Sequence, residues 1–330
     1  MTVLLDRLRP HPHRGDVIAA GAVPLALAAL LIELRMRQWS LGPRFVVVAL
    51  LSGLILTMGW LAPLEDPSPR PYHTVLLIAG LLPLAVALVL LAEVLGARRP
   101  PGVGGLAWTF AFESALAAAA ARRTRSAACT LVAAIAGLVA VEAAVGWVFR
   151  PQGLGTFRAV LLVLTACFGV GAVRLRDRER RHAVQLVNAA GVTALVLAAT
   201  YVYAVAVVSL LRDSGAFLTA FGAVHPSAPF GWKLYLVAIG FGLTAYGAVD
   251  REPGPAYLGV LVLATFLVLA GLPLGERGSL VGWPLFLLAI GAAGLAVGLR
   301  PRRPLPPEPG PRAAGPAVPI DPDHRDPTST

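Results

Sequence analysis

Charged residues are scarce in this 330-residue sequence, and lysine is almost missing. Charged residues make up 14% of the chain, and Lys233 is the single lysine among 28 basic residues. A soluble domain usually has about 25% charged residues, so the composition argues against a soluble globular fold. The hydrophobic share of 57% and the mean hydropathy of +0.73 instead predict an all-α fold, a polytopic integral membrane helix bundle.

Cysteine and the usual catalytic signatures are also missing or rare. The two cysteines, Cys129 and Cys167, fall in predicted helices, so neither a disulfide framework nor a thiolate metal site is indicated. The sequence contains no HExxH, no GxSG context and no GxxxxGK[ST] phosphate loop. His11 and His13 stand in a proline-containing basic segment, where we expect exposure to solvent. We therefore expect no metal, no cofactor and no catalysis.

Positive charge is present, with a net value of +10, and it is arranged in short clusters between apolar segments. Such clusters follow the positive-inside rule for membrane proteins and do not form a nucleic-acid-binding face. The clusters RLRDRERRH at 174–182 and RPRRP at 300–304 are therefore expected in the cytoplasm. Together with the abundance of arginine and alanine, this pattern predicts a multi-pass protein of the bacterial inner membrane, with the lipid bilayer as its partner.

Apolar segments long enough to cross the bilayer, which takes about 20 residues, recur along the whole chain. Residues 1–16 are a basic N-terminal segment, 17–299 form the predicted transmembrane bundle, and 300–330 are a proline-rich tail expected to be disordered and cytoplasmic. Ten spans are expected, at 17–34, 45–63, 74–96, 106–121, 127–149, 157–173, 184–211, 234–249, 256–274 and 280–299.

The fourth of these spans, 106–121, is the weakest, because it is mostly alanine and has Glu113 near its middle. If it crosses the membrane, the chain has ten helices and both termini lie in the cytoplasm. If it lies in the interface, there are nine helices and the N-terminus is external. The loop arginines do not distinguish the two topologies, and the hairpin-like flanks of the segment favour ten.

The seventh span carries a polar stripe. At 100° per residue, Gln185, Asn188, Thr193, Thr200 and Tyr203 fall on one helix face. This face could line a cavity for a small solute, or it could form hydrogen bonds between helices, each typically worth under 2 kcal/mol in membranes. The pattern alone favours the second interpretation.

Two carboxylates are expected within the membrane. Glu142 lies inside the fifth span, and Glu113 joins it on the preceding helix only in the ten-helix topology. An intramembrane carboxylate is a candidate for proton or cation coupling, although it can also be a neutral group bonded to a neighbouring helix. Glu33 and Glu93, at helix ends, are expected to pair with Arg37 and Arg98.

Two weaker patterns concern partners and chemistry. Gly294 and Gly298 form a GxxxG step that favours close helix packing, within the chain or in a homo-oligomer. His225 and Asp213 in the loop at 212–233 would have to converge for a membrane enzyme. The sequence as a whole favours a non-catalytic membrane component, with a secondary carrier of a small solute as the alternative.

Overall fold

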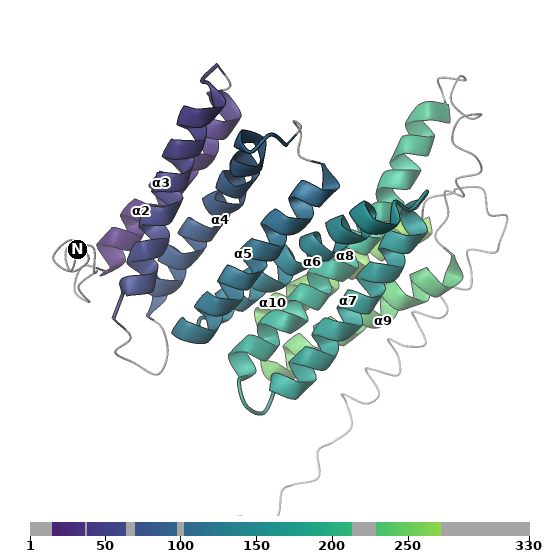
Figure 1. Ribbon diagram of the computed structural model, residues 1–330. Coiled ribbons are helices and arrows are strands. Elements are labelled where there is room, and N and C mark those ends of the chain that lie inside the picture. Colours follow the sequence, from purple (N-terminus) through teal and green to yellow (C-terminus); the bar gives the residue numbers. More distant parts are fainter. Residues whose placement is uncertain (1–14, 37, 64–69, 98–101, 213–228, 272–330) are drawn as a thin grey trace, which may run out of the picture. The chain divides into compact units, whose positions relative to one another are not determined.

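The computed structural model describes residues 15–36, 38–63, 70–97, 102–212 and 229–271. At 203–212 and 270–271 it describes the backbone alone. Every regular element in these ranges is an α-helix. The nine helices found there correspond in order to the first nine predicted spans (Figure 1): α2 Gly15–Arg35, α3 Leu41–Leu61, α4 Pro71–Val94, α5 Val103–Thr124, α6 Ala127–Phe149, α7 Leu154–Leu175, α8 Arg180–Arg212, α9 Phe230–Asp250 and α10 Pro253–Gly271.

Eight of these helices are long and apolar enough to cross a membrane, and α10 adds a shorter apolar stretch, Pro253–Leu269. The prediction of a helical membrane bundle is thereby confirmed, whereas the count of ten remains a prediction. The predicted span at 280–299 with Gly294 and Gly298, the tail at 300–330 and the N-terminal residues 1–14 lie outside the described residues.

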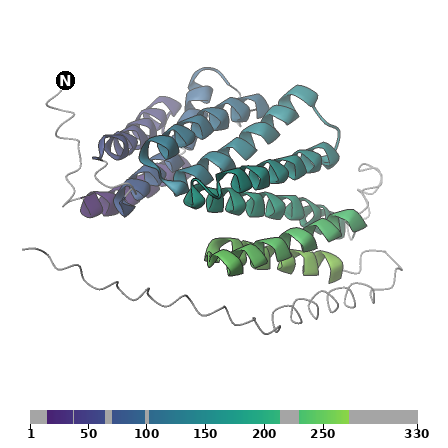
Figure 2. The ribbon, with the colours of Figure 1, turned by 90° about the horizontal axis from the view of Figure 1, so that it is seen from below.

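Short connections set the packing order of the helices. Consecutive helices α5 and α6, α7 and α8, and α9 and α10 pack as hairpins, and α2, α3 and α4 pack with one another. Figures 1 and 2 show the α9–α10 hairpin in green. Three of the connections begin at Arg125, Arg150 and Arg251, whose φ angles of 55°, 45° and 57° are left-handed. This conformation ends an α-helix and turns the chain back.

Two helices have central positions in the packing. Helix α4 contacts α2, α3, α5 and α6, and helix α8 contacts α6, α7, α9 and α10. Their apolar stretches are 56% and 50% buried, against 28% or less in the six other candidate spans of the described residues. Residues of α4 and α8 are therefore the ones placed to form a site inside the protein.

The structure describes 103–124, which includes the doubtful fourth segment, as one arm of a hairpin. At one end of this hairpin, a Cβ atom added to Gly104 would lie 3.1 Å from the Trp147 ring. Further along, the Ser114 hydroxyl donates a hydrogen bond of 2.8 Å to the Ala133 carbonyl. Helix α5 thus lies antiparallel along α6 and meets the length and composition expected of a span.

Candidate functional site

Glu142 lies on the face of α6 that is turned away from α5. Leu138 and Ala134, one and two turns earlier, are buried. Thr130, twelve residues earlier and about 120° further round the helix, is hydrogen-bonded through its hydroxyl to the His182 ring of α8. Both carboxylate oxygens of Glu142 are buried, and neither has a hydrogen-bond partner in the described part of the chain.

The helix geometry places two threonines at the same depth as Glu142. Helices α6 and α8 run in the same direction because α7 returns the chain between them. Glu142 is twelve residues beyond Thr130, and Thr193 is eleven residues beyond His182, so both lie about 17 Å from that shared contact. On α7, Thr165 is six residues before Gly171, which faces Leu186 of α8. We call Glu142, Thr165 and Thr193 the polar layer.

Each threonine of the polar layer donates its hydroxyl proton to a carbonyl of its own helix, and its hydroxyl oxygen can still accept a hydrogen bond. Thr165 donates to the Leu161 carbonyl at 2.8 Å, and Thr193 donates to the Ala189 carbonyl at 2.7 Å. Each hydroxyl oxygen keeps lone pairs that can accept a hydrogen bond or contact a cation. The Tyr235 side chain of α9 approaches Thr165. Neither threonine is hydrogen-bonded to Glu142 among the described residues, so the members of the polar layer share a depth along the helix axes and not a direct contact.

Arg158 of α7 is a positively charged residue nearer the start of α7 than Thr165 of the polar layer. Its Nε donates to the Thr200 hydroxyl at 3.0 Å and its terminal nitrogen to the Thr200 carbonyl at 3.3 Å. The guanidinium lies 3.5 Å from the centre of the Tyr201 ring, which is a cation–π contact. The sequence analysis missed this group. An arginine just inside a predicted span was the available signal.

The polar stripe predicted for α8 contacts more than one neighbouring helix. Asn188 donates to the Gln185 side chain at 3.2 Å and lies against Gly254 of α10. Thr193 is 0% exposed, and Thr200 donates to the Leu197 carbonyl at 2.7 Å. The stripe therefore divides between different helix contacts. The Tyr203 side chain is outside the described residues, and the cavity stays a prediction.

Glu113 and Glu142 are on consecutive helices but face different neighbours. Glu113 is 4% exposed and follows Thr109 and precedes Ala117 on one buried face of α5. Ala117 packs in a cluster with Leu77 and Leu81 of α4. Glu113 therefore lies on the α4 side, and its Oε2 has no hydrogen-bond partner within the described residues. The structure does not bring the two carboxylates together.

A half-buried ion pair joins α2 to α3. Arg44, which is 1% exposed, contacts both carboxylate oxygens of Glu33 at 3.1 and 3.0 Å. The sequence analysis assigned Glu33 to Arg37 and Glu93 to Arg98, and both arginines lie outside the described residues. Spacing within one helix cannot reveal a partner that comes from the next helix.

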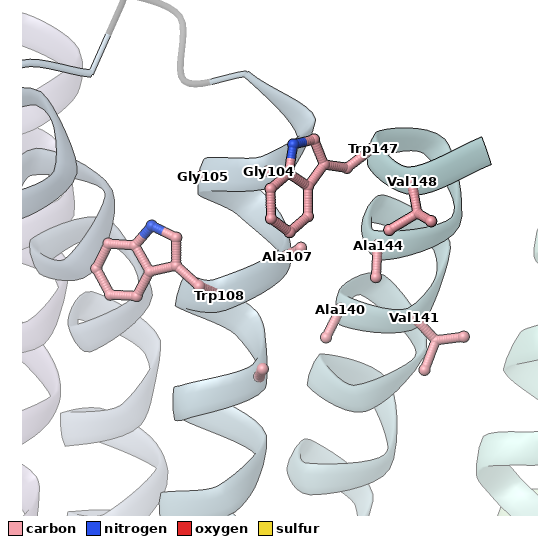
Figure 3. A pocket seen from close by; sticks show the side chains of 10 residues that line it. Gly104, Gly105, Ala107, Trp108, Ala140, Val141, Ala144, Trp147 and Val148 are labelled. Carbon is pink, nitrogen blue, oxygen red and sulfur yellow. The ribbon is translucent and has the colours of Figure 1, made fainter. Parts of the chain in front are cut away.

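A surface groove lies between α5 and α6 (Figure 3). Its volume is about 720 Å³, and its lining is apolar: Gly104, Gly105, Ala107, Trp108, Ala111, Ala140, Val141, Ala144, Trp147 and Val148. A smaller pocket of about 210 Å³ lies between α3, α4 and α5. Neither hollow is lined by a residue of the polar layer.

No cluster of three histidine, cysteine, aspartate or glutamate residues that could hold a metal occurs among the described residues. His225 and Asp213, the pair considered for catalysis, lie outside them. Comparison with known proteins adds no relationship: the sequence matches neither a protein-family model nor a curated protein.

Proposed function

We propose that this chain is a bacterial inner-membrane carrier of a small solute, with ten spans and both termini in the cytoplasm. The number and length of its apolar helices support membrane embedding. The arginine clusters at 122–125, 174–181 and 300–303 support the orientation, since cytoplasmic connections are rich in arginine. No observation calls for bond-making chemistry, so the proposal includes no catalysis and no cofactor.

The observation that carries the transport proposal is the unpartnered carboxylate of Glu142. A charged residue near the middle of a membrane costs about 2.5 to 3.5 kcal/mol on insertion scales. Such residues persist in membrane proteins mainly where they bind protons, ions or substrate. In this proposal Glu142 takes up a proton or a cation at the polar layer, and the uptake is coupled to movement of the solute.

A packed, non-catalytic membrane component is the second candidate, and the polar groups of α8 support it. Thr193, Thr200 and Asn188 all have hydrogen bonds within the protein. A component of this kind needs no water at the polar layer, and Glu142 would be a neutral, buried acid. The two candidates therefore differ in whether water reaches Thr193 and Glu142.

Thiol accessibility separates the candidates. Cys129 and Cys167 are replaced by alanine, and Thr193→Cys is introduced as the reporter, with Val196→Cys, at an exposed position of α8, as the control in lipid. A carrier that alternates its access exposes the reporter thiol to a small, membrane-impermeant cationic reagent, while the control thiol stays unreacted in hydrocarbon. Protection of both thiols in folded protein on either side of the membrane would contradict the carrier and favour the packed component.

A further inference from the structure

The groove between α5 and α6 is lined by residues of both helices. Its floor consists of glycine and alanine from both helices, namely Gly104, Gly105, Ala107, Ala111, Ala140 and Ala144. Trp108, which is 42% exposed, and Trp147, which is 57% exposed, rise above this floor. In Figure 3, Trp147 extends from α6 toward the first turns of α5.

The groove has the size and lining of a ligand site and lies in the hydrocarbon. Its volume of about 720 Å³ falls within the 300–1,000 Å³ that is common for small-molecule sites. Both helices have the length and apolar composition of membrane spans, so we expect hydrocarbon and not water to fill this space. A linear acyl chain matches an open apolar trough between two helices.

The end of the groove that holds Gly104 and Val148 is suited to a negative group. Arg150 follows the last residue of α6 directly, is exposed, and comes two residues after Val148, which lines the groove. Helix α5 begins at the same end, with Gly102 as an N-cap that has no side-chain hydrogen bond. The first N–H groups of a helix lack a partner within the helix and favour anions. The two indole N–H groups are donors of the kind found at membrane interfaces.

We propose that the α5–α6 groove binds one anionic glycerophospholipid, with an acyl chain between Trp108 and Trp147 and its phosphate at Arg150 and the start of α5. Charge complementarity at the mouth selects a lipid over a second protein helix, because a helix would bring apolar side chains to this arginine. In the ten-span topology the lipid belongs to the external leaflet. The site is separate from the polar layer and does not depend on the transport proposal.

Native mass spectrometry of the full chain in detergent tests this site. The protein is mixed with phosphatidylglycerol or with phosphatidylcholine of the same acyl chains. The wild type is expected to retain one phosphatidylglycerol, with a preference of at least about fivefold over phosphatidylcholine, the factor that one basic residue near an anionic group supplies. Ala111→Leu, which fills the groove, should lose the bound lipid. Ala119→Leu, an exposed position on α5 outside the groove, should keep it.

Arg150→Gln tests the headgroup separately from the chain. It should abolish the preference for phosphatidylglycerol and leave weak retention of both lipids, because the apolar groove is unchanged. The proposal is overturned if Ala111→Leu retains as much phosphatidylglycerol as Ala119→Leu, or if Arg150→Gln keeps the wild-type preference. It is also overturned if the wild type appears as a dimer without lipid and Ala111→Leu makes it monomeric, because a second copy would then occupy the groove.

Discussion

The carboxylate oxygens of Glu142 are buried and have no hydrogen-bond partner among the described residues. A substitution of Glu142 should therefore affect transport and protein stability differently. Glutamine has nearly the same shape as glutamate and no charge, so Glu142→Gln should leave the free energy of unfolding unchanged or slightly higher at neutral pH. In a carrier it should abolish proton uptake coupled to the solute. A pH-sensitive dye inside proteoliposomes, challenged with a panel of small solutes, measures this uptake, and thermal unfolding in detergent measures stability.

The control for this experiment is Glu179→Gln, because Glu179 lies in the short connection between α7 and α8 and its side chain is 60% exposed. It should keep both stability and uptake. A marked loss of stability in Glu142→Gln, with uptake reduced only in proportion to the folded fraction, would mean that Glu142 has a structural role.

The ion pair between Glu33 and Arg44 should stabilise the protein strongly in a single-substitution test. Arg44 is 1% exposed, so Glu33→Gln leaves a buried guanidinium without its carboxylate. Breaking a fully buried pair costs about 3–5 kcal/mol, and because the Glu33 side chain is 23% exposed the expected loss is below that range. The double variant Glu33→Gln, Arg44→Met removes the buried charge as well and should recover most of that loss. Thermal unfolding of the four proteins of this cycle gives the coupling energy. If the two single effects simply add, the pair contributes little.

The sequence located Glu142 and Glu113 but could not assign their surroundings. A charged residue inside an apolar run is visible without a structure, because hydrophobicity along the chain reports its depth. The direction of its side chain depends on which helix packs against which face, and that information lies between segments far apart in sequence. The same limit explains why Arg158 was missed, since its contacts, Thr200 and Tyr201, are on the next helix.

The order of the helices along the chain could be predicted from the sequence, but the residues at which they begin and end could not. The predicted span at 106–121 is helical over Val103–Thr124 in the structure. Apolar length predicts only the part within the hydrocarbon, whereas backbone hydrogen bonds continue the helix into the polar interface. Arg123 illustrates this, because it lies in the last turn and its guanidinium is 5.0 Å from the centre of the Trp60 ring of α3.

Close contact between α3 and α4 depends on Gly80. A Cβ atom added there would lie 2.6 Å from Leu56 Cγ and 2.9 Å from the Leu56 backbone nitrogen. Gly80→Ala must therefore push the helices apart, and overpacking of this kind costs about 1–3 kcal/mol. Gly53→Ala, on α3, is the matched control because nothing lies within 4 Å of its added Cβ atom. It should be neutral or raise stability by about 0.5–1 kcal/mol, owing to the helix preference of alanine.

Unfolding monitored by circular dichroism in detergent compares the two glycine variants. Opposite signs of the stability change are expected, with the loss confined to Gly80→Ala. Equal effects at both positions would show that the distance between α3 and α4 is not limited by this glycine.

For the whole molecule, the ten-span and nine-span topologies differ in the placement of α5. Helix α5 lies antiparallel along α6 from Gly104 beside Trp147 to the connection at 125–126. If α6 crosses the membrane, a helix packed along it in this way has the same tilt and crosses as well. The Ser114 hydrogen bond to Ala133 in the middle of the hairpin agrees with this packing, and we therefore expect α5 to cross together with α6.

Thiol labelling in intact cells tests this topology directly. In a variant with Cys129→Ala and Cys167→Ala, the single substitution Ser40→Cys, at an exposed position between α2 and α3, should react with an impermeant reagent, because ten spans make this connection external. Gln152→Cys and Asp177→Cys are the external and cytoplasmic references, since both topologies agree on those loops. Protection of the thiol at position 40 until the cells are permeabilised, with the external reference labelled, would falsify the ten-span topology. Glu113 would then leave the bilayer, and Glu142 would remain as the intramembrane carboxylate predicted from the sequence.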